Sequence, residues 1–505
     1  MPKMRKITTA LISTLFLIFL STLSSCRNEN FSTDPNHRLT FSADTVSFQT
    51  VFSDIPSSTR RIMVHNRNNR ALRISEIGLV PSATSSYFRV NVDGATNPDN
   101  HFRNIEIGAR DSMHIFIAVN VAELGQDAPL FIQDRLFFNT NGVMQHIVLE
   151  TYGQDVEIFH GKTILNDTTL TANRPYIIRD TLRIAEGATL TLEAGTRLFF
   201  HNNAALFVFG NLVAEGTAEQ PIVMRGNRFD NINFARPVPY NLVAGQWNGL
   251  YLLGNGTHRM HHVNINSADV GIYLSANTLS PIPAPSEMPT LELSNSRIHN
   301  FLFHGLFAHN ANVTVANSVI SNSASYTVLL NGGEHIFVHT TIANYFNSGV
   351  SAVQARNRNS SHPAVMIMNM DRSLPMKTVF LNSAIAGSVS NEFTLATRFP
   401  HEYNGIFRNS YIKRNPLELP QFQDIRWYER GDVIFQSTAM NINNNQYYNF
   451  EPDSVSPLLR LADPNVMDLP EFARFNLRFD LNGNDRTESE IPAAGAFEFR
   501  DLKEE

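Results

Sequence analysis

Short segments in which hydrophobic and polar residues alternate with a period of two fill the chain between residues 39 and 155. Seven or eight such segments follow one another, separated by clusters of Pro, Gly, Asn and Asp. Because a strand places successive side chains on opposite faces, this period predicts half-buried strands, and the clusters predict turns between them. We therefore expect a β-sandwich of immunoglobulin-like (Ig-like) architecture over residues 39–155.

After residue 155 the pattern changes to repeated short apolar segments that meet at corners of small residues. Three isoleucines stand at equal intervals of 22 residues: Ile298, Ile320 and Ile342. Five residues before each of them stands another apolar side chain: Leu293, Val315 and Phe337. Ile265 and Ile385 fit the same frame as flanking coils, and Phe380 stands five residues before the latter. Apolar positions that recur once per coil indicate a stacked core, so we predict a parallel β-helix over residues 156–400, followed by irregular coils and a cap over residues 401–505.

Several runs resemble known families. Residues 208–217 (VFGNLVAEGT) and 247–250 (WNGL) resemble the opening coils of right-handed parallel β-helix proteins. Residues 480–486 (DLNGNDR) and 493–499 (AAGAFEF) are similar to the closing signature of exported β-helix repeat proteins, which implies an end coil over the open edge. Residues 43–52 (ADTVSFQTVF) resemble Ig-like domains of the spindle-protein and Hydin group, which bind partners or act as spacers.

The N-terminus has the features of an export signal. A short basic stretch (MPKMRK) precedes an apolar run that is too short for a comfortable membrane span. The run ends in LSSC, which resembles the lipobox of bacterial lipoproteins, whose Cys receives acyl chains such as palmitate and becomes the mature N-terminus. Cys26 is the only Cys in the chain, and lipidation explains its uniqueness. We expect a signal peptide over residues 1–25 and a tether over residues 26–38; the alternative is an ordinary signal peptide with an incidental Cys.

The cellular location that this resemblance implies is the outer membrane of a Bacteroidetes-type bacterium. Arg27 stands where an Asp retains many enterobacterial lipoproteins in the inner membrane. The acidic tract of surface-exposed lipoproteins is barely suggested, because residues 27–34 carry only Glu29 and Asp34. The periplasmic and the external orientation therefore both stay open.

Five tripeptides resemble the Asp, Ser/Thr, apolar acceptor for O-glycosylation in exported Bacteroidetes proteins. Their hydroxyl residues are Thr45, Ser112, Thr168, Thr181 and Ser454. An Asp at a turn followed by Thr and an aliphatic residue also commonly begins a strand, so both interpretations stay open.

The hexapeptides NSRIHN (295–300), NSVISN (317–322) and HTTIAN (339–344) raise the question of a polar site. Their last residues, Asn300, Asn322 and Asn344, would lie one strand spacing apart in successive coils. Asn also tolerates the left-handed backbone conformation that a coil corner requires. We interpret the three residues as a structural Asn ladder, with a sugar-binding row as the alternative.

The candidate chemistry for catalysis is sparse. Between residues 291 and 354 the charged side chains are Glu292, Arg297 and Glu334. Glycoside hydrolysis in a β-helix needs paired carboxylates, and elimination from uronic acids needs clustered Asp, Arg and Lys with calcium. Catalytic residues would have to come from the C-terminal segment or from three aspartates elsewhere: Asp230, Asp269 and Asp371.

The histidines and the net charge limit which metals, cofactors and macromolecules the protein is expected to bind. His258, His261 and His262 lie close together in the sequence, but His261 and His262 point to opposite faces of a strand. No acidic residue or Cys accompanies the three histidines as a further ligand, so we expect no metal and no cofactor. The formal charge of -6 becomes -9 without residues 1–25, which carry three positive charges. A mildly acidic protein without a basic block is a poor candidate for nucleic-acid binding.

Aromatic residues in the irregular C-terminal part are candidate ligand contacts. They are Trp427, Tyr428, Tyr447 and Tyr448, and packing of a capping segment explains them as well. The sequence thus predicts a lipid-anchored, non-catalytic cell-envelope protein that binds a protein partner or a glycan, or serves as an accessory subunit of an outer-membrane complex. The alternative is a polysaccharide-active β-helix lyase or glycoside hydrolase.

Replacing Cys26 with Ala removes the thiol that acylation requires. We expect Cys26→Ala to shift the protein from the membrane fraction to the soluble fraction, measured by fractionation and immunoblotting. If the variant stays with the membranes at the wild-type level, the lipoprotein interpretation is wrong.

Overall fold

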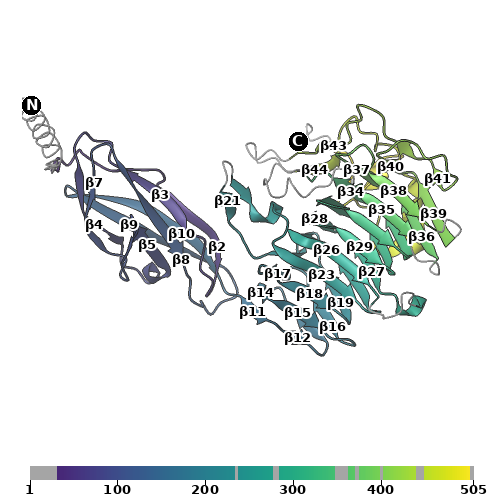
Figure 1. The fold of residues 1–505 in the computed structure, drawn as a ribbon, viewed down its shortest axis with the longest axis horizontal. Helices are drawn as coiled ribbons and strands as arrows, with labels where there is room; N and C mark the ends of the chain where they lie inside the picture. The colour runs from purple at the N-terminus through teal and green to yellow at the C-terminus, as the bar shows by residue number, and fades with distance from the viewer. Residues whose placement is uncertain are drawn as a thin grey trace, which may run out of the picture. The chain divides into compact units, whose positions relative to one another are not determined.

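The computed structural model describes residues 31–233, 237–276, 284–346, 362–369, 375–398, 402–439 and 448–500. Nearly all of their regular structure is β (Figure 1). The chain divides into two compact units: the first comprises residues up to Leu124 and Pro129–Gly153, and the second comprises Gly125–Ala128 and the residues from Gln154 onward. In the described part of the chain, no helix is long and apolar enough to cross a membrane. The predicted all-β fold class is confirmed.

The first unit is a β-sandwich of two five-stranded sheets. One sheet has the order β1 (Thr40–Phe41), β3 (Arg60–His65), β8 (Ser112–Val119), β5 (Phe88–Val92) and β6 (Ala95–Thr96). The other has the order β2 (Thr45–Phe52), β10 (Val143–Gln154), β9 (Leu130–Thr140), β4 (Leu72–Leu79) and β7 (Phe102–Ile107). A short 3-10 helix, η1 (Ser85–Tyr87), precedes β5.

The alternating pattern that predicted this sandwich also builds its core. Along β8 every second side chain is at most 5% exposed: Met113, Ile115, Ile117 and Val119. They join apolar residues of the opposite sheet, such as Leu136 and Phe138, in one buried cluster. The β-sandwich prediction is confirmed, with ten strands where seven or eight were predicted.

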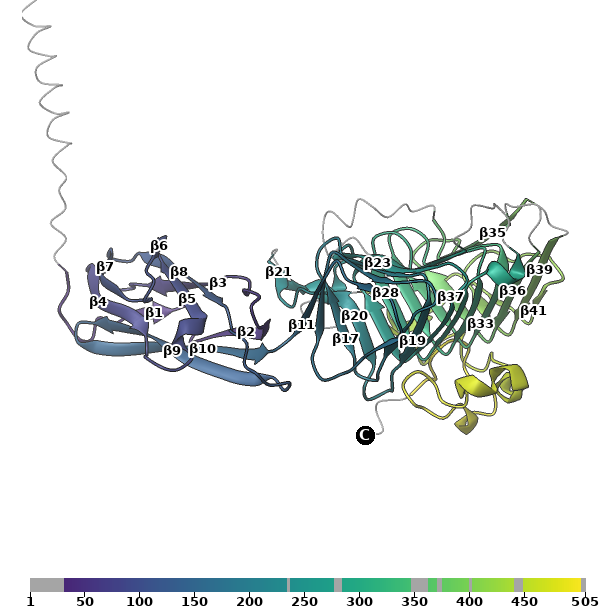
Figure 2. The ribbon, with the colours of Figure 1, turned by 90° about the horizontal axis from the view of Figure 1, so that it is seen from below.

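The second unit is a parallel β-helix in which consecutive strands alternate between three sheets (Figures 1 and 2). The eleven-stranded sheet contains β11 (Glu157–His160), β14 (Tyr176–Arg179), β17 (Arg197–Phe200), β20 (Ile222–Gly226), β25 (Val263–Asn266), β28 (Arg297–Phe301), β31 (Val319–Ser323), β34 (Thr341–Asn344), β37 (Ala384–Gly387), β40 (Tyr411–Ile412) and β42 (Arg426–Trp427). The nine-stranded sheet contains β12 (Thr163–Ile164), β15 (Thr181–Ile184), β18 (Ala205–Val208), β23 (Trp247–Leu253), β26 (Ala268–Ser275), β29 (Leu306–His309), β32 (Val328–Asn331), β35 (Val365–Asn369) and β38 (Phe393–Thr397). The ten-stranded sheet contains β13 (Thr168–Leu170), β16 (Thr189–Leu192), β19 (Asn211–Glu215), β24 (Thr257–His261), β27 (Thr290–Ser294), β30 (Asn312–Ala316), β33 (Gly333–Val338), β36 (Met376–Leu381), β39 (Tyr403–Arg408) and β41 (Phe422–Gln423).

Smaller elements complete this unit. A two-stranded ribbon of β21 (Asn231–Asn233) and β22 (Pro237–Pro239) leads into η2 (Tyr240–Leu242), and η3 (Pro285–Glu287) precedes β27. The closing segment, which we define as residues 434–439 and 448–500, contains β43 (Phe435–Ser437), β44 (Asn449–Pro452), η7 (Pro464–Asp468), η8 (Pro470–Phe475) and η9 (Arg486–Glu488).

The strand register confirms the predicted repeat. One series of isoleucines is paired from coil to coil: Ile265, Ile298, Ile320, Ile342 and Ile385. A second series pairs in the same way: Leu293, Val315, Phe337 and Phe380. All of these side chains are at most 1% exposed, and the rings of Phe337 and Phe380 stack at 4.5 Å. Equivalent residues therefore lie on top of one another and fill a continuous core.

A row of hydroxyls fixes one corner of the coils. It consists of Ser296, Ser318, Thr340, Ser383 and Ser410. Each hydroxyl donates to the carbonyl two residues earlier, as Ser318 does to Ala316 at 2.7 Å. Ser318 also accepts from the backbone N–H of Ser296, one coil earlier, at 3.0 Å. Because these groups are buried, the row satisfies backbone groups that water cannot reach.

The final coil seals the end of the β-helix. Four side chains pack partly buried against the last layer of the core: Leu417, Phe422, Ile425 and Trp427. The resemblance led us to expect the closing signature over this edge, but the structure places it along the flank of earlier coils. Gly495 donates its N–H to the carbonyl of Asn382, and Ala496 donates to Oγ1 of Thr341 at 2.9 Å. Figure 2 shows this segment, in yellow, beside the coils.

A buried ion pair fastens the closing segment. The guanidinium of Arg486 is 0% exposed and donates to Glu498 at 2.8 Å and to the side-chain carbonyl of Asn317 at 2.8 Å. Glu498 accepts in addition from the backbone N–H of Ala493, while Asp480 accepts from the N–H of Glu498. Each charge is thus paired and hydrogen-bonded, which a buried ion pair requires.

Removing Arg486 tests this fastening, because Arg486→Met leaves the carboxylate of Glu498 buried without its cation. We expect the free energy of unfolding of the second unit to fall by roughly 3–5 kcal/mol. Urea titration followed by tryptophan fluorescence measures it, since Trp247 and Trp427 both belong to this unit. The matched control is Arg478→Met, which removes a solvent-exposed pair with Asp485 and should change little. Equal losses in both variants would contradict this role.

Candidate functional site

The outer face of the eleven-stranded sheet is covered by the closing segment in its later coils. Small outward side chains make this possible: Ala343, Ala384 and Ala386 are fully buried beneath Phe435, Phe450 and Phe497. They form a second apolar core, outside the β-helix. Earlier along the same face, outward positions of β28 carry the larger polar side chains Arg297 and His299. The closing segment does not fill the space beside them.

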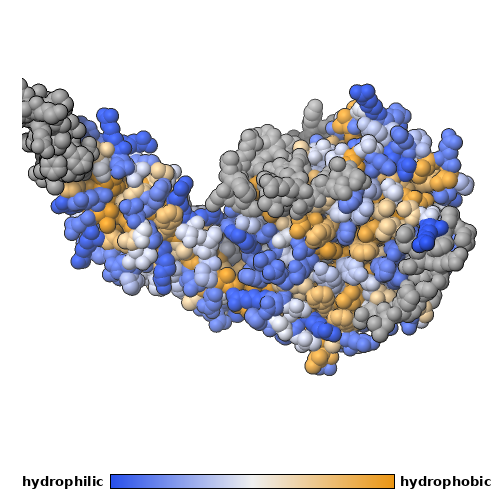
Figure 3. Space-filling model, viewed as in Figure 1, coloured by the Kyte–Doolittle hydropathy of each residue, from blue (hydrophilic) through white to orange (hydrophobic). Residues whose placement is uncertain are grey.

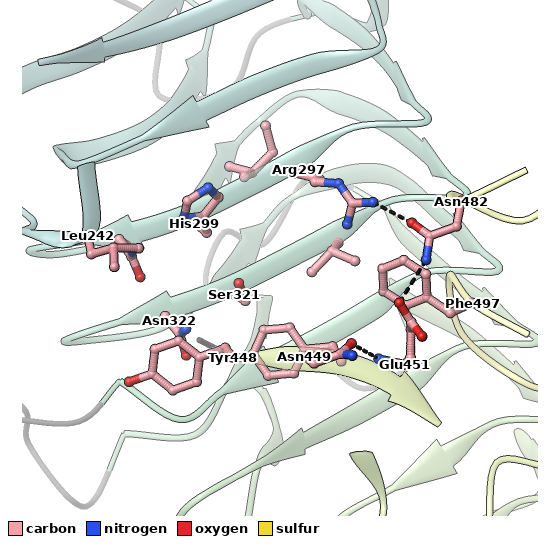
Figure 4. A pocket seen from close by; sticks show the side chains of 14 residues that line it. Leu242, Arg297, His299, Ser321, Asn322, Tyr448, Asn449, Glu451, Asn482 and Phe497 are labelled. Atoms are coloured by element: carbon pink, nitrogen blue, oxygen red, sulfur yellow. Dashed lines mark hydrogen bonds between the residues drawn. The ribbon is translucent and has the colours of Figure 1, made fainter. Parts of the chain in front are cut away.

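A pocket of about 300 Å³ remains there, between β28 and β31 on one side and β44 on the other (Figure 4). Its lining comprises Leu242, Arg297, Ile298, His299, Asn300, Val319, Ser321, Asn322, Tyr448, Asn449, Phe450, Glu451, Asn482 and Phe497. Backbone pairing sets the floor, because Arg297 lies opposite Val319 and His299 opposite Ser321 on adjacent strands. The pocket combines aromatic walls with a polar floor, as ligand pockets commonly do.

One part of the pocket is a chain of satisfied hydrogen bonds. Arg297 donates to the side-chain carbonyl of Asn482 at 2.7 Å, and the amide of Asn482 donates to Glu451 at 2.9 Å (Figure 4). The guanidinium of Arg297 lies 5.3 Å from the ring centre of Phe497. Burial lowers the pKa of Arg297, while the charges of Glu451 and Asp480 act in the opposite direction. Glu451 is the one carboxylate among the described residues that line the pocket.

The other part contains polar groups without partners among the described residues. The hydroxyl of Ser321 makes no hydrogen bond there, although the residue is 2% exposed. His299 likewise has no hydrogen bond from its ring within the described chain, and burial, with the charges of Arg297 and Arg225, lowers its pKa to about 4. Asn322 accepts from the N–H of Tyr345, which leaves its amide donors open. These groups are available to a ligand.

The sequence-predicted asparagines occupy equivalent corners of successive coils. Asn300, Asn322 and Asn344 are at most 3% exposed, and the first two have left-handed φ values of +65° and +55°. The side-chain carbonyls of Asn322 and Asn344 accept from backbone N–H groups. An amide-to-amide bond between coils occurs at the other end of the hexapeptide, where Asn317 donates to Asn295 at 2.6 Å.

The three aromatic candidates that the structure describes have different surroundings. Trp427 packs against the last core layer, with its ring centre 5.4 Å from that of Phe422. Tyr428 contacts the second core, and Lys413 lies over its ring. Tyr448 lines the pocket and donates its hydroxyl to the carbonyl of Tyr345 at 3.2 Å. Tyr447, like Cys26, lies outside the described residues.

No printed contact joins the two candidate aspartates that the structure describes, Asp230 and Asp269. Asp230 pairs with Arg228, and Asp371 lies outside the described residues. Asp269 is half-buried, its pKa is raised by burial, and its carboxylate makes no hydrogen bond or ion pair with described residues. A second hollow carries Asp468 and Glu490, but the closing segment alone lines it. Within the described chain, no group of three or more His, Cys, Asp or Glu side chains is placed to hold a metal ion.

The predicted glycosylation residues lie at the surface, two of them exposed and three half-buried. They are Thr45, Ser112, Thr168, Thr181 and Ser454. The first four begin strands, namely β2, β8, β13 and β15. This location suits both the modification and the turn-to-strand interpretation, so the two predictions stay open.

An aromatic ladder crosses the outer face of the nine-stranded sheet. Phe207, Tyr251, Tyr273 and Phe307 follow one another with ring-centre distances of 4.7, 5.8 and 5.1 Å. Phe207 and Tyr251 are stacked within 18° of parallel, so their faces cover each other. We interpret the ladder as a stabilising contact between coils. Figure 3 shows this unit's surface as a mosaic of hydrophobic and hydrophilic residues.

Sequence reasoning missed the pocket. Arg297 and His299 are the residues by which NSRIHN differs from NSVISN, where Val319 and Ser321 stand. These two differences, at outward positions of otherwise similar hexapeptides, are the signal that could have indicated the floor of the pocket. Glu451 and Asn482 offered no signal, because Asn482 contacts Arg297 across 185 residues of sequence and Glu451 is held by Asn482.

Similarity to known proteins covers a minor part of this chain in each case. No family model matches it. Protein bark beetle from Drosophila melanogaster is 37% identical over 83 residues, which are 15% of this chain and 3% of that protein's length. A family 123 glycoside hydrolase from Clostridium perfringens has a TM-score of 0.18 and 4% identity, over 24% of this chain and 30% of its own.

Two further solved structures are similar over about a quarter of this chain. A protein of unknown function from Porphyromonas gingivalis has a TM-score of 0.17 and 12% identity, over 26% of this chain and 58% of its own. A PapD-like domain of human CEP192 has a TM-score of 0.16 and 10% identity, over 26% of this chain and 94% of its own. None of these similarities carries a functional argument.

Buried histidines inside the β-helix predict a loss of stability in acid. His258 and His335 are 0% exposed, and burial lowers the pKa of each from 6.5 to about 4. Above pH 6.5 both are neutral in either state. As the pH falls from 6.5 to 4, the unfolded chain binds protons that the folded chain does not, so the free energy of unfolding decreases.

We expect His335→Gln to reduce this pH dependence, measured by urea titration with tryptophan fluorescence between pH 7 and 4. His201→Gln, at an exposed position of the β-helix unit, is the matched control. An unchanged slope in His335→Gln would show that His335 does not contribute.

Proposed function

We propose that this protein is a lipid-anchored, non-catalytic cell-envelope protein that binds a glycan in the pocket between β28, β31 and β44. The anchor is Cys26 and the membrane is the outer membrane, as the lipobox resemblance implies. The Ig-like unit acts as a spacer, and the β-helix carries the binding site.

The observation that carries the proposal is the set of unpartnered polar groups beside an aromatic wall. Ser321, His299 and the amide of Asn322 offer hydrogen bonds, and Tyr448 supplies an amphipathic ring. Sugars present hydroxyl groups together with apolar C–H faces, so they complement both kinds of surface. A ligand oxygen that accepts from Ser321 gives this hydroxyl a hydrogen-bond partner that it lacks among the described residues.

A polysaccharide-active enzyme is the second candidate, because Arg297, His299 and Tyr448 are groups that can bind and deprotonate a sugar acid. Glycoside hydrolysis by the usual route uses two carboxylates. Among the described residues that line the pocket, Glu451 is the one carboxylate, and it accepts a hydrogen bond from Asn482. This arrangement favours binding over hydrolysis.

Filling the pocket tests the proposal. We expect the wild-type protein to be retained on a glycan array and Ser321→Leu to lose at least tenfold in affinity for the retained glycan, because the added methyl groups occupy the floor. Ser454→Leu, at an exposed position, should bind like the wild type. Circular dichroism and urea titration show whether each variant is folded.

Three outcomes would contradict the proposal. Ser321→Leu that is folded and binds normally places the glycan elsewhere. A stoichiometric envelope protein in native membrane preparations, without retention of any glycan, indicates an accessory subunit. Shortened or unsaturated products after incubation with the bound glycan indicate an enzyme.

A further inference from the structure

The pocket offers several open hydrogen-bond donors. Arg297 uses one nitrogen for Asn482 and has no other hydrogen bond from its guanidinium within the described chain. The amide nitrogen of Asn322 and the hydroxyl of Ser321 also have no described partner. His299 is neutral near pH 7, so its ring offers one N–H. A ligand group that only accepts hydrogen bonds is the complement of such a set.

A second positive charge lies on β20, two strands before β28 in the same sheet, without a carboxylate partner among the described residues. Arg225 belongs to β20, and its guanidinium donates to the backbone carbonyls of Gly226 and Arg228. Among the described residues no acid pairs with it, and burial lowers its pKa to about 10. Its charge reaches His299, whose pKa it lowers. This partly buried cation lacks the counter-ion that such charges ordinarily have.

The negative charges near the pocket are already engaged. Glu451 accepts from Asn482 at 2.9 Å. Asp480 is 4% exposed and accepts from the backbone N–H groups of Asn482, Asn484 and Glu498. These hydrogen bonds leave both carboxylates charged, and both act on Arg297, whereas no described lining residue between His299 and Ser321 is acidic.

We propose that this pocket binds the carboxylate of an acidic sugar, placed over the floor between Arg297, His299 and Ser321. The inference rests on the proposed function and names its ligand class. The carboxylate accepts from the guanidinium of Arg297 and from the hydroxyl of Ser321. The pyranose ring lies toward Tyr448 and Leu242, the apolar part of the lining.

The test compares two ligands that differ in charge alone. Tetragalacturonate and its carboxyl-reduced form are titrated into the purified full-length protein by isothermal calorimetry at low ionic strength. We expect the acidic form to bind at least tenfold more tightly. Arg297→Gln should abolish this preference while retaining a weaker affinity for both forms. Arg259→Gln, the same substitution at an exposed position of the ten-stranded sheet, should leave it unchanged.

The outcomes separate the inference from the proposed function. Equal or tighter binding of the carboxyl-reduced form overturns the inference and leaves glycan binding intact. A preference for the acidic form that survives in folded Arg297→Gln also overturns it, because a residue other than Arg297 then recognises the carboxylate. Absence of binding by both forms overturns the inference, and the glycan array then decides whether the proposed function fails as well. Loss of the preference in Arg297→Gln, but not in Arg259→Gln, supports the inference.

Discussion

Hydrogen bonding of each coil to the next, at a strand spacing of roughly 4.8 Å, is the constraint on which the second unit depends. It places each side chain on its equivalent in the neighbouring coil, so one position repeats as a row. Inward rows become apolar stacks, such as the one through Phe337 and Phe380. Corner rows become hydroxyl ladders, such as the one through Ser296 and Ser318, which satisfy buried backbone groups.

The same constraint explains where the surface departs from regularity. Rows of alanine on the outer face of the eleven-stranded sheet let the closing segment lie close and form a second core. Three coils earlier than Ala384, the rows change to Arg297 and His299, which the closing segment does not cover in the same way. The pocket is therefore the consequence of a break in a repeat, bounded by a segment that the regular rows hold in place.

The sequence predicted the features that depend on nearby residues or on a fixed interval. Alternation along β8 predicted the sandwich, and the spacing of Ile298, Ile320 and Ile342 predicted the register, because both follow from local periodicity. The path of the closing segment was not predictable, since Arg486 reaches Asn317 across a long stretch of sequence. Tyr448 was named as a candidate contact because it is aromatic, whereas nothing in the sequence singled out Glu451 and Asn482. Their role depends on tertiary packing, which no interval in the chain encodes.

The buried pairing of Arg486 with Asn317 and Glu498 has a consequence for the order of synthesis. A ribosome makes the coils of β28 and β31 long before it makes β44 and the turn at Asn482. Coils can stack as they emerge, because each contacts its neighbours along the chain. The pocket, in contrast, has walls only after nearly the whole chain has been made and the closing segment has returned to the earlier coils. The proposed ligand recognition is thereby confined to finished molecules, and a chain that is cut short would display the floor without the walls of the pocket.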